Sequence, residues 1–234
     1  MTAPALCARG LGKLFHHRLP RYASLAGRLR LWTEGGRGSL PVWALRDVSF
    51  ELARGECLGV AGPNGSGKST LLALLAGILE PTEGSVSVAG RVSTLININA
   101  GLQPDLSVSD NVEIFAVLMG LRRREALRRV PAVLEFAGLS GLAEVRMGEL
   151  STGQVARVAF SAAVHADLDV LLVDEALSVG DAAFQEKCRG AFERLRGEGK
   201  TMVVISHDEG LLRGLCTRIL RLDAGRAAAL EAVG

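Results

Sequence analysis

The chemistry of this chain centres on one stretch whose residue types and spacing match G-x-x-x-x-G-K-[ST]: Gly62-Pro63-Asn64-Gly65-Ser66-Gly67-Lys68-Ser69-Thr70. Its glycines allow the backbone to curl, so that successive N–H groups face one centre and bind polyphosphate together with the positive end of a following helix. Lys68 is expected to reach the β- and γ-phosphates of a nucleotide, and the Ser69 hydroxyl to ligate Mg²⁺. A glycine-rich turn with a surface lysine is the alternative. The apolar strand expected before it and the helix expected after it favour nucleotide binding.

Two carboxylates and a histidine follow other apolar runs of the chain. Asp174 and Glu175 end the run that starts at Val170, and His207 follows the run Thr201–Ile205. Asp174 suits Mg²⁺ binding through water, and Glu175 is expected to be the general base that orients the attacking water. A pair of acids at a helix N-terminus is the alternative for Asp174 and Glu175. A structural role is the alternative for His207, for which we favour a contact with the γ-phosphate.

Hydrophobic periodicity predicts short strands that alternate with helices. We expect strands at Ala5–Phe15 (an edge strand), Val42–Ala53, Cys57–Ala61, Ser85–Val88, Val92–Ile98, Val170–Glu175, Thr201–Ile205, Arg218–Leu222 and Arg226–Leu230. We expect helices at Leu71–Leu79, Ser107–Met119, Arg122–Ala137 (interrupted near Pro131), Val155–His165, Ala182–Arg196 and Glu209–Cys216. This order indicates an α/β fold with a mostly parallel sheet covered on both faces. Gly62, Asp174, Glu175 and His207 then meet at the carboxyl ends of its strands.

Composition narrows the class of protein. The 234 residues are 48% hydrophobic and 22% charged, which allows a packed core without disulfides, and the 4% aromatic share indicates a mainly aliphatic one. A net charge of +2 argues against a nucleic-acid binder. The cysteines are scattered without a C-x-x-C pair, which favours reduced thiols over zinc or disulfides. No signal pattern or membrane-length apolar run occurs, so we expect a soluble protein with any membrane role through a partner.

A basic insertion at about residues 16–41 stands out. It has five arginines against the single acid Glu34, and apolar residues recur at helical spacing from Leu19 to Trp32. This pattern predicts a short basic amphipathic helix. A solvated insertion packed on its own domain is favoured over contact with anionic lipid headgroups or a membrane partner. The arginines of residues 122–129 are interpreted as a solvated face.

Two further motifs lie in a definite order relative to the phosphate loop and the two acids. Leu150-Ser151-Thr152-Gly153-Gln154 follows the phosphate loop, and Ser178-Val179-Gly180-Asp181 follows the two acids. Nearly the whole chain resembles the ATP-binding-cassette (ABC) ATPases. The resemblance implies a P-loop NTPase cassette over residues 1–234, with a mostly parallel core, an antiparallel β subdomain and a helical subdomain at about 100–165. It also implies a homodimer with two ATP molecules at its interface. Ser151, Gly153 and Gln154 match the family signature, which faces the γ-phosphate held by the other subunit, whereas Thr152 replaces a glycine; Asp181 is assigned to the same nucleotide site.

Two family features stay open. The glutamine of the loop that leads into the helical subdomain has three candidates, Asn97, Asn99 and Gln103. The aromatic side chain that stacks on adenine is either Phe15 or Trp43, and we prefer Phe15 because it ends the first expected strand.

One branch of the family is similar in further detail. The basic insertion before Trp43, the loop 99–106 and the stretch 173–184 resemble bacterial exporters of O-antigen, capsule and teichoic acid. The resemblance implies an ATPase subunit that powers outward transport of a lipid-linked polysaccharide through a membrane permease. It would lie peripherally on the cytoplasmic face of the inner membrane. Because the chain ends directly after the cassette, we expect no C-terminal carbohydrate-binding domain. The alternatives are an ABC ATPase for another exported substrate, a soluble ABC protein acting on ribosomes or DNA, and a non-catalytic binder; an intact Glu175 and His207 argue against the last.

Overall fold

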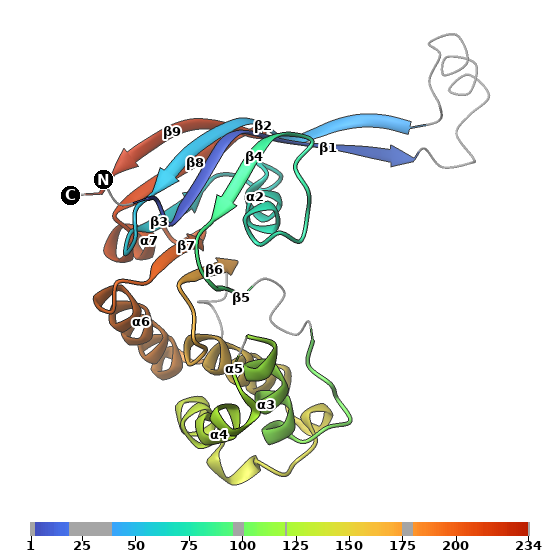
Figure 1. Cartoon of the computed structure of the whole chain (residues 1–234), viewed down its shortest axis with the longest axis vertical. Helices are drawn as coiled ribbons and strands as arrows, with labels where there is room; N and C mark the ends of the chain where they lie inside the picture. The colour runs from blue at the N-terminus through green and yellow to red at the C-terminus, as the bar shows by residue number, and fades with distance from the viewer. Residues whose placement is uncertain (1–2, 19–38, 96–100, 120, 175–179, 234) are drawn as a thin grey trace.

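The computed structural model describes residues 3–18, 39–95, 101–119, 121–174 and 180–233. Two sheets lie at one end, and a helical part with α3, α4 and α5 extends from the side of β5 and β6 (Figure 1). The expected mixture of a mainly parallel sheet, an antiparallel sheet and a helical region is confirmed.

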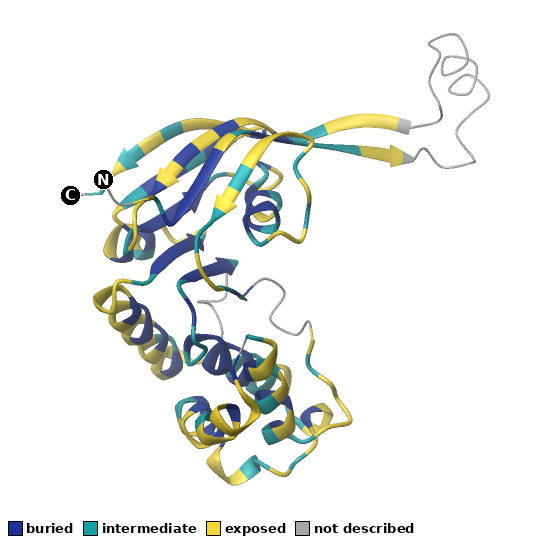
Figure 2. Ribbon diagram, viewed as in Figure 1, coloured by how far each residue is buried: buried dark blue, intermediate teal, exposed yellow. Residues whose placement is uncertain are grey.

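The larger sheet has six strands in the order β5-β6-β7-β3-β8-β9. Its neighbouring strands are parallel except for the hairpin of β8 and β9. The strands are β3 (Cys57–Ala61), β5 (Val92–Leu95), β6 (Val170–Asp174), β7 (Thr201–Ile205), β8 (Arg218–Asp223) and β9 (Arg226–Ala232). The central strands β3, β6 and β7 are almost continuous aliphatic runs because both of their faces are buried (Figure 2).

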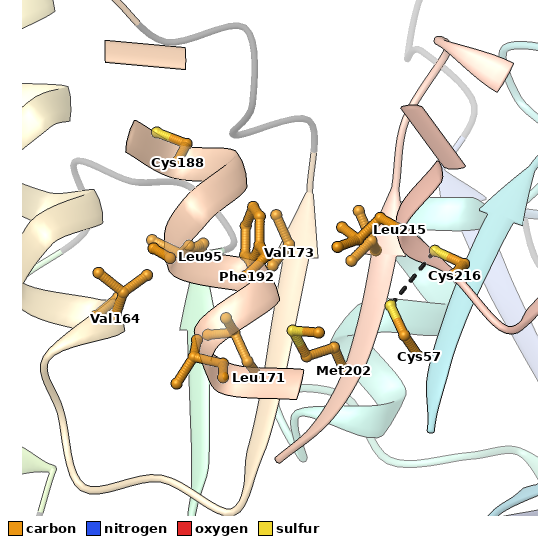
Figure 3. Packing of buried hydrophobic residues seen from close by; sticks show 14 of the residues in the cluster. Cys57, Leu95, Val164, Leu171, Val173, Cys188, Phe192, Met202, Leu215 and Cys216 are labelled. Carbon is orange, nitrogen blue, oxygen red and sulfur yellow. Dashed lines mark hydrogen bonds between the residues drawn. The ribbon is translucent and has the colours of Figure 1, made fainter. Parts of the chain in front are cut away.

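Alternate residues of these strands face two separate cores. Leu171 and Val173 of β6 pack in the core that includes α5 and α6 residues, part of which Figure 3 shows around Phe192. Val170 and Leu172 face the opposite core, which the smaller sheet and α2 complete. Besides α5, the helices that pack in these two cores are α2 (Lys68–Leu75), α6 (Ala182–Gly197) and α7 (Glu209–Leu215).

The smaller sheet is antiparallel and has the order β2-β1-β4, with β1 (Leu6–Arg18), β2 (Ser39–Leu52) and β4 (Glu83–Val88). The expected edge position of the first strand is wrong, because β1 lies between β2 and β4. Periodicity reports which side of a strand is buried, but not how many neighbours it has. Pairing with β4 ends at Gly12, so the outer halves of β1 and β2 form a two-stranded ribbon (Figure 1). Residues 19–38 of the basic insertion, with its expected helix, lie outside the described residues.

The helical part consists of α3 (Val108–Leu118), α4 (Arg123–Ala137) and α5 (Thr152–Val164), with short 3₁₀ turns at Ser140–Leu142 and Met147–Glu149. Ser107 begins α3 as expected, because its side chain accepts the Asp110 N–H. The expected interruption of α4 at Pro131 is wrong. Proline removes one backbone donor, but the buried neighbours Val130, Val133 and Leu134 hold the helix in the core around it.

Two other helices have boundaries that differ from expectation. Helix α2 begins inside the phosphate-binding motif at Lys68 and stops before Gly77, whose φ of 70° suits a glycine at a helix end. Helix α5 begins at Thr152 because Ser151 caps it. The core is mainly aliphatic, as expected, but aromatic rings gather where α4, α5 and α6 meet: Phe136, Phe160, Phe184 and Phe192. No helix in the described part of the chain is long and apolar enough to cross a membrane.

Candidate functional site: a phosphate-binding loop at the edge of the sheet

The loop 62–70 connects β3 to α2 in a shape that two of its glycines make possible. Gly62 and Gly67 have φ values of 151° and 101°. A Cβ at Gly62 would lie 2.2 Å from the Leu222 carbonyl oxygen, and one at Gly67 would lie 2.5 Å from the Ala44 carbonyl oxygen. Both positions therefore exclude a side chain, because the backbones of β8 and β2 press against the loop.

Lys68 is held within this loop. Its side chain is buried, and its ammonium group donates to the carbonyl oxygens of Gly62 at 2.8 Å and Pro63 at 3.1 Å. A lysine ammonium has three donors, so among the described residues one N–H is left for a further acceptor. The positive charge thus lies at the N-terminus of α2, where an anion is favoured.

The remaining polar groups of the loop also fit a polyphosphate. The backbone N–H groups of Lys68, Ser69 and Thr70 lie in the first turn of α2, where a helix supplies no acceptor of its own. Ser66 Oγ is buried without a hydrogen-bond partner among the described residues, whereas Ser69 is exposed. The donors and the charge of the loop therefore match phosphate oxygens.

Asp174 and His207 lie at the same edge of the sheet as this loop. Strand β7 pairs with β6 on one side and β3 on the other, and Ile205 is in register with both Asp174 and Val60. Asp174 at the end of β6, His207 just beyond β7 and Gly62 just beyond β3 therefore follow neighbouring carboxyl ends. Glu175 falls outside the described residues.

Among the described residues, few side chains near the loop could supply oxygen ligands to Mg²⁺. No group of three or more His, Cys, Asp or Glu side chains suited to a metal occurs in the described ranges. Mg²⁺ typically uses one or two carboxylates together with phosphates and water. The Ser69 hydroxyl and the half-buried Asp174 carboxylate fit that pattern.

The N-terminus of α5 presents a second set of expected site residues. Ser151 and Gln154 cap the helix reciprocally: Gln154 Oε1 accepts the Ser151 N–H at 2.9 Å, and Ser151 Oγ accepts the Gln154 N–H at 3.3 Å. Gly153 is exposed, and a Cβ there would meet nothing within 4 Å. This helix belongs to the helical part, whereas α2 and its loop lie beside the two sheets (Figure 1).

Asp181 lines the same pocket of about 410 Å³ as Ser151, Gly153 and Gln154 at this N-terminus. Asp181 caps α6, because its Oδ1 accepts the Phe184 N–H at 2.9 Å. Its Oδ2 accepts from Arg157 at 3.0 Å. The Phe184 N–H and then the Arg157 guanidinium hold the pKa of the Asp181 carboxyl below its usual value.

The loop that leads into the helical part is organised by a residue that sequence reasoning missed. Asn111 is buried, its Oδ1 accepts the Gln103 N–H at 2.6 Å, and its Nδ2 donates to the carbonyls of Gln103 at 3.0 Å and Ser107 at 2.8 Å. Its position in the apolar face between Val108 and Val112 is a signal that could have identified it. Of the glutamine candidates, Asn97 and Asn99 lie outside the described residues.

The two candidates for adenine stacking lie on the outer part of the β1–β2 ribbon. The Phe15 ring has the Lys13 ammonium 5.5 Å from its centroid, and the Trp43 ring has the Arg46 guanidinium 5.1 Å away. The backbone of Ala44 reaches Gly67 of the loop. Both rings are only partly buried, and the preference for Phe15 stays a prediction.

Several known proteins are similar to this chain in sequence. Residues 45–178 match the ABC transporter family. The ABC transporter protein AbcA of Aeromonas salmonicida is 36% identical over 96% of this chain and 72% of its own length. The O-antigen export system ATP-binding protein RfbB of Klebsiella pneumoniae is 36% identical over 78% of this chain and 74% of its own length. The teichoic acids export ATP-binding protein TagH of Listeria innocua is 38% identical over 78% of this chain, and the match spans only 54% of that protein.

The fold of this chain is also similar to that of a solved structure. A dimeric ATP-binding cassette in a post-hydrolysis state with ADP and inorganic phosphate superimposes with a TM-score of 0.79. It covers 98% of this chain and 99% of its own, at 24% identity. The likeness shows a common cassette fold over nearly the whole chain.

Proposed function

Because the chain belongs to the ABC transporter family, we propose that it is the ATP-hydrolysing subunit of an exporter that moves a lipid-linked cell-surface polysaccharide outward. The observation that carries this proposal is the similarity, at 36% and 38% identity, to ATP-binding proteins of O-antigen and teichoic acid export. O-antigen and teichoic acids are both polymers of the cell surface, so the common element of the cargo is a surface glycan or glycan-like polymer.

The nucleotide binds in loop 62–70 by the groups that fit phosphate. The N–H groups at the start of α2 and the Lys68 ammonium bind the β- and γ-phosphates of ATP. Ser69 and Asp174 supply the oxygen ligands of Mg²⁺, which neutralises charge on these phosphates. Glu175 orients the attacking water as general base, and His207 donates to the γ-phosphate.

A second copy of the chain completes the site. Ser151, Gly153 and Gln154 lie on the helical part, whereas the loop lies beside the sheets. The N-terminus of α5 carries a partial positive charge suited to a γ-phosphate bound by the partner. Two copies arranged head to tail then hold two ATP molecules between them. The dimeric form of the solved cassette with ADP and inorganic phosphate supports this arrangement.

Transport requires a membrane permease, with the cassette dimer peripheral on the cytoplasmic face of the inner membrane. The basic insertion at about residues 16–41 is a second candidate for membrane contact, through its arginines and anionic headgroups.

Co-purification tests this function. Tagged wild-type protein and the Lys68→Ala and Glu175→Gln variants are purified from detergent-solubilised membranes of the source cell, and ATPase activity and bound partners are measured. We expect a multi-spanning permease with bound glycolipid in each case. ATP hydrolysis is expected in the wild type only, with ATP retained by Glu175→Gln and lost by Lys68→Ala. Recovery with ribosomes or DNA would overturn the transport role, and full activity of Glu175→Gln would overturn the assignment of the base.

A further inference from the structure

Arg157 connects two segments that line one pocket, α5 with its cap and the start of α6. It lies on α5, less than two turns after the cap residue Ser151. Its guanidinium donates to Asp181 Oδ2 at 3.0 Å and lies 5.2 Å from the centroid of the Phe184 ring. Its Nε would be 3.2 Å from a Cβ at Gly180. One side chain of α5 therefore contacts both Asp181 and Phe184 at the start of α6, and it occupies the space that a side chain at Gly180 would need.

These contacts restrain orientation more than they stabilise the fold. The Asp181 side chain is 64% exposed, so solvent and salt screen its attraction to Arg157. A guanidinium, however, is planar, so donating to a carboxylate while stacking on a ring fixes its direction. The Phe184 ring beneath it is buried and packs edge-on against Phe136 and Phe160. Arg157 is thus held between a rigid aromatic cluster and the cap of α6.

The two segments that Arg157 connects are the ones proposed above to contact the nucleotide bound by the second copy. Ser151, Gly153 and Gln154 line the pocket from α5 and its cap, Gly180 and Asp181 line it from the start of α6, and Gly138, Leu139 and Arg157 complete the lining. The distance between these two segments decides whether both reach one phosphate. A misplacement of about 1 Å in such a site can cost about 10²-fold in rate.

We propose that Arg157 is a positioning residue for ATP hydrolysis, which fixes the spacing between the N-terminus of α5 and Asp181 so that both engage the nucleotide of the partner copy. This inference rests on the proposed function. It concerns the dimeric, hydrolysing state, because loop 62–70 of the same chain binds its phosphates without Arg157.

The test compares variants of the full chain by steady-state ATPase kinetics and by titration with a fluorescent ATP analogue. For Arg157→Gln we expect kcat to fall at least about ten-fold, with the dissociation constant of the analogue and the urea midpoint close to those of the wild type. Arg157→Lys keeps the charge but loses the planar fork, and is expected to recover part of the rate. Arg189→Gln is the control, because it breaks an ion pair with Glu186 within α6, in which the arginine side chain is 56% exposed compared with 27% for Arg157, and it should leave kcat unchanged.

A double variant shows whether Arg157 acts through Asp181. Asp181→Asn retains an oxygen that caps α6 but removes the charge that pairs with Arg157. We expect Arg157→Gln/Asp181→Asn to be no slower than the slower single variant, because both changes remove one interaction. If the fold-losses of kcat in the two single variants multiplied in the double variant, the inference would be overturned. It would also be overturned if Arg157→Gln had the kcat of the wild type, or if its kcat fell together with equal losses in nucleotide affinity and stability. Absence of ATPase activity in the wild type would instead overturn the proposed function and this inference with it.

Discussion

Phe160 offers a direct test of how the helical part is joined to the sheet. The ring is fully buried on α5, and its neighbours are Phe136 on α4 at 6.3 Å and Phe184 and Phe192 on α6 at 5.9 and 5.6 Å between centroids. Replacing this ring removes contacts to both α4 and α6. Phe160→Ala should therefore destabilise the whole chain, not α5 alone.

The size of the effect follows from burial and ring contacts. Truncating a buried phenylalanine to alanine costs about 3–5 kcal/mol through lost transfer energy and a cavity. For a chain of this length each kcal/mol lowers the melting temperature by about 2–4 °C, so we expect a decrease of about 6–20 °C. Phe160→Leu keeps most of the volume but loses the two edge-on contacts with Phe184 and Phe192. These contribute about 0.5–1.5 kcal/mol each, so this variant should lose about 1–3 kcal/mol.

Urea unfolding followed by far-ultraviolet circular dichroism measures these changes. Leu118→Ala is the control, because Leu118 also lies in the helical part but is 69% exposed. It should change the free energy of unfolding by less than about 0.5 kcal/mol. If Phe160→Ala were as mild as this control, the cluster would not join α4, α5 and α6, and the reasoning would be refuted.

Other predictions address the loop, the half-buried His165 and the thiols. Gly62→Ala should weaken binding of a fluorescent ATP analogue by at least about ten-fold, because its Cβ would meet the Leu222 carbonyl oxygen at 2.2 Å; unchanged affinity would contradict the loop geometry. Burial lowers the pKa of His165 in the folded chain below its usual value of 6.5. The neutral ring therefore contributes its full stability above pH 6.5, and this contribution is lost as the pH falls through the lower folded-state pKa. The free energy of unfolding of His165→Gln should therefore depend less on pH between about pH 7 and 5 than that of the wild type, and parallel pH curves would exclude this role. Burial raises the pKa of the Cys188 thiol to about 12, and all four cysteines are buried, so iodoacetamide should label the chain only after unfolding in urea; rapid labelling of the native protein would contradict this.

The parts of the fold that sequence predicts well are those that local pattern determines. Strands β3, β6 and β7 are short aliphatic runs because both of their faces are buried. The ends of these runs in the sequence predict that Asp174 and His207 lie at the carboxyl ends of β6 and β7. The cap at Ser107 was recognisable because it depends on a residue only three positions away.

Features that depend on distant neighbours were not predictable in this way. The central position of β1 follows from pairing with β4, and the continuity of α4 through Pro131 follows from packing around it. The contact of Arg157 with Asp181 joins residues on two helices, and periodicity does not report which polar side chains meet. Catalytic roles of Glu175 and His207, and the choice between Phe15 and Trp43, remain predictions.

The order of strands in the larger sheet has a consequence for how the chain folds as it is synthesised. Strand β3 lies early in the sequence, but its neighbours β7 and β8 come much later in the sequence and therefore leave the ribosome long after it. The shape of loop 62–70 depends on the same late segment, because Leu222 of β8 presses against Gly62. Until β7 and β8 are synthesised, the aliphatic faces of β3 stay exposed. Pairing between segments so far apart in the sequence makes folding slow and prone to aggregation. A nascent chain stalled before β8 should need a chaperone and should bind no nucleotide, so nucleotide added during synthesis would stabilise only chains that already include β8.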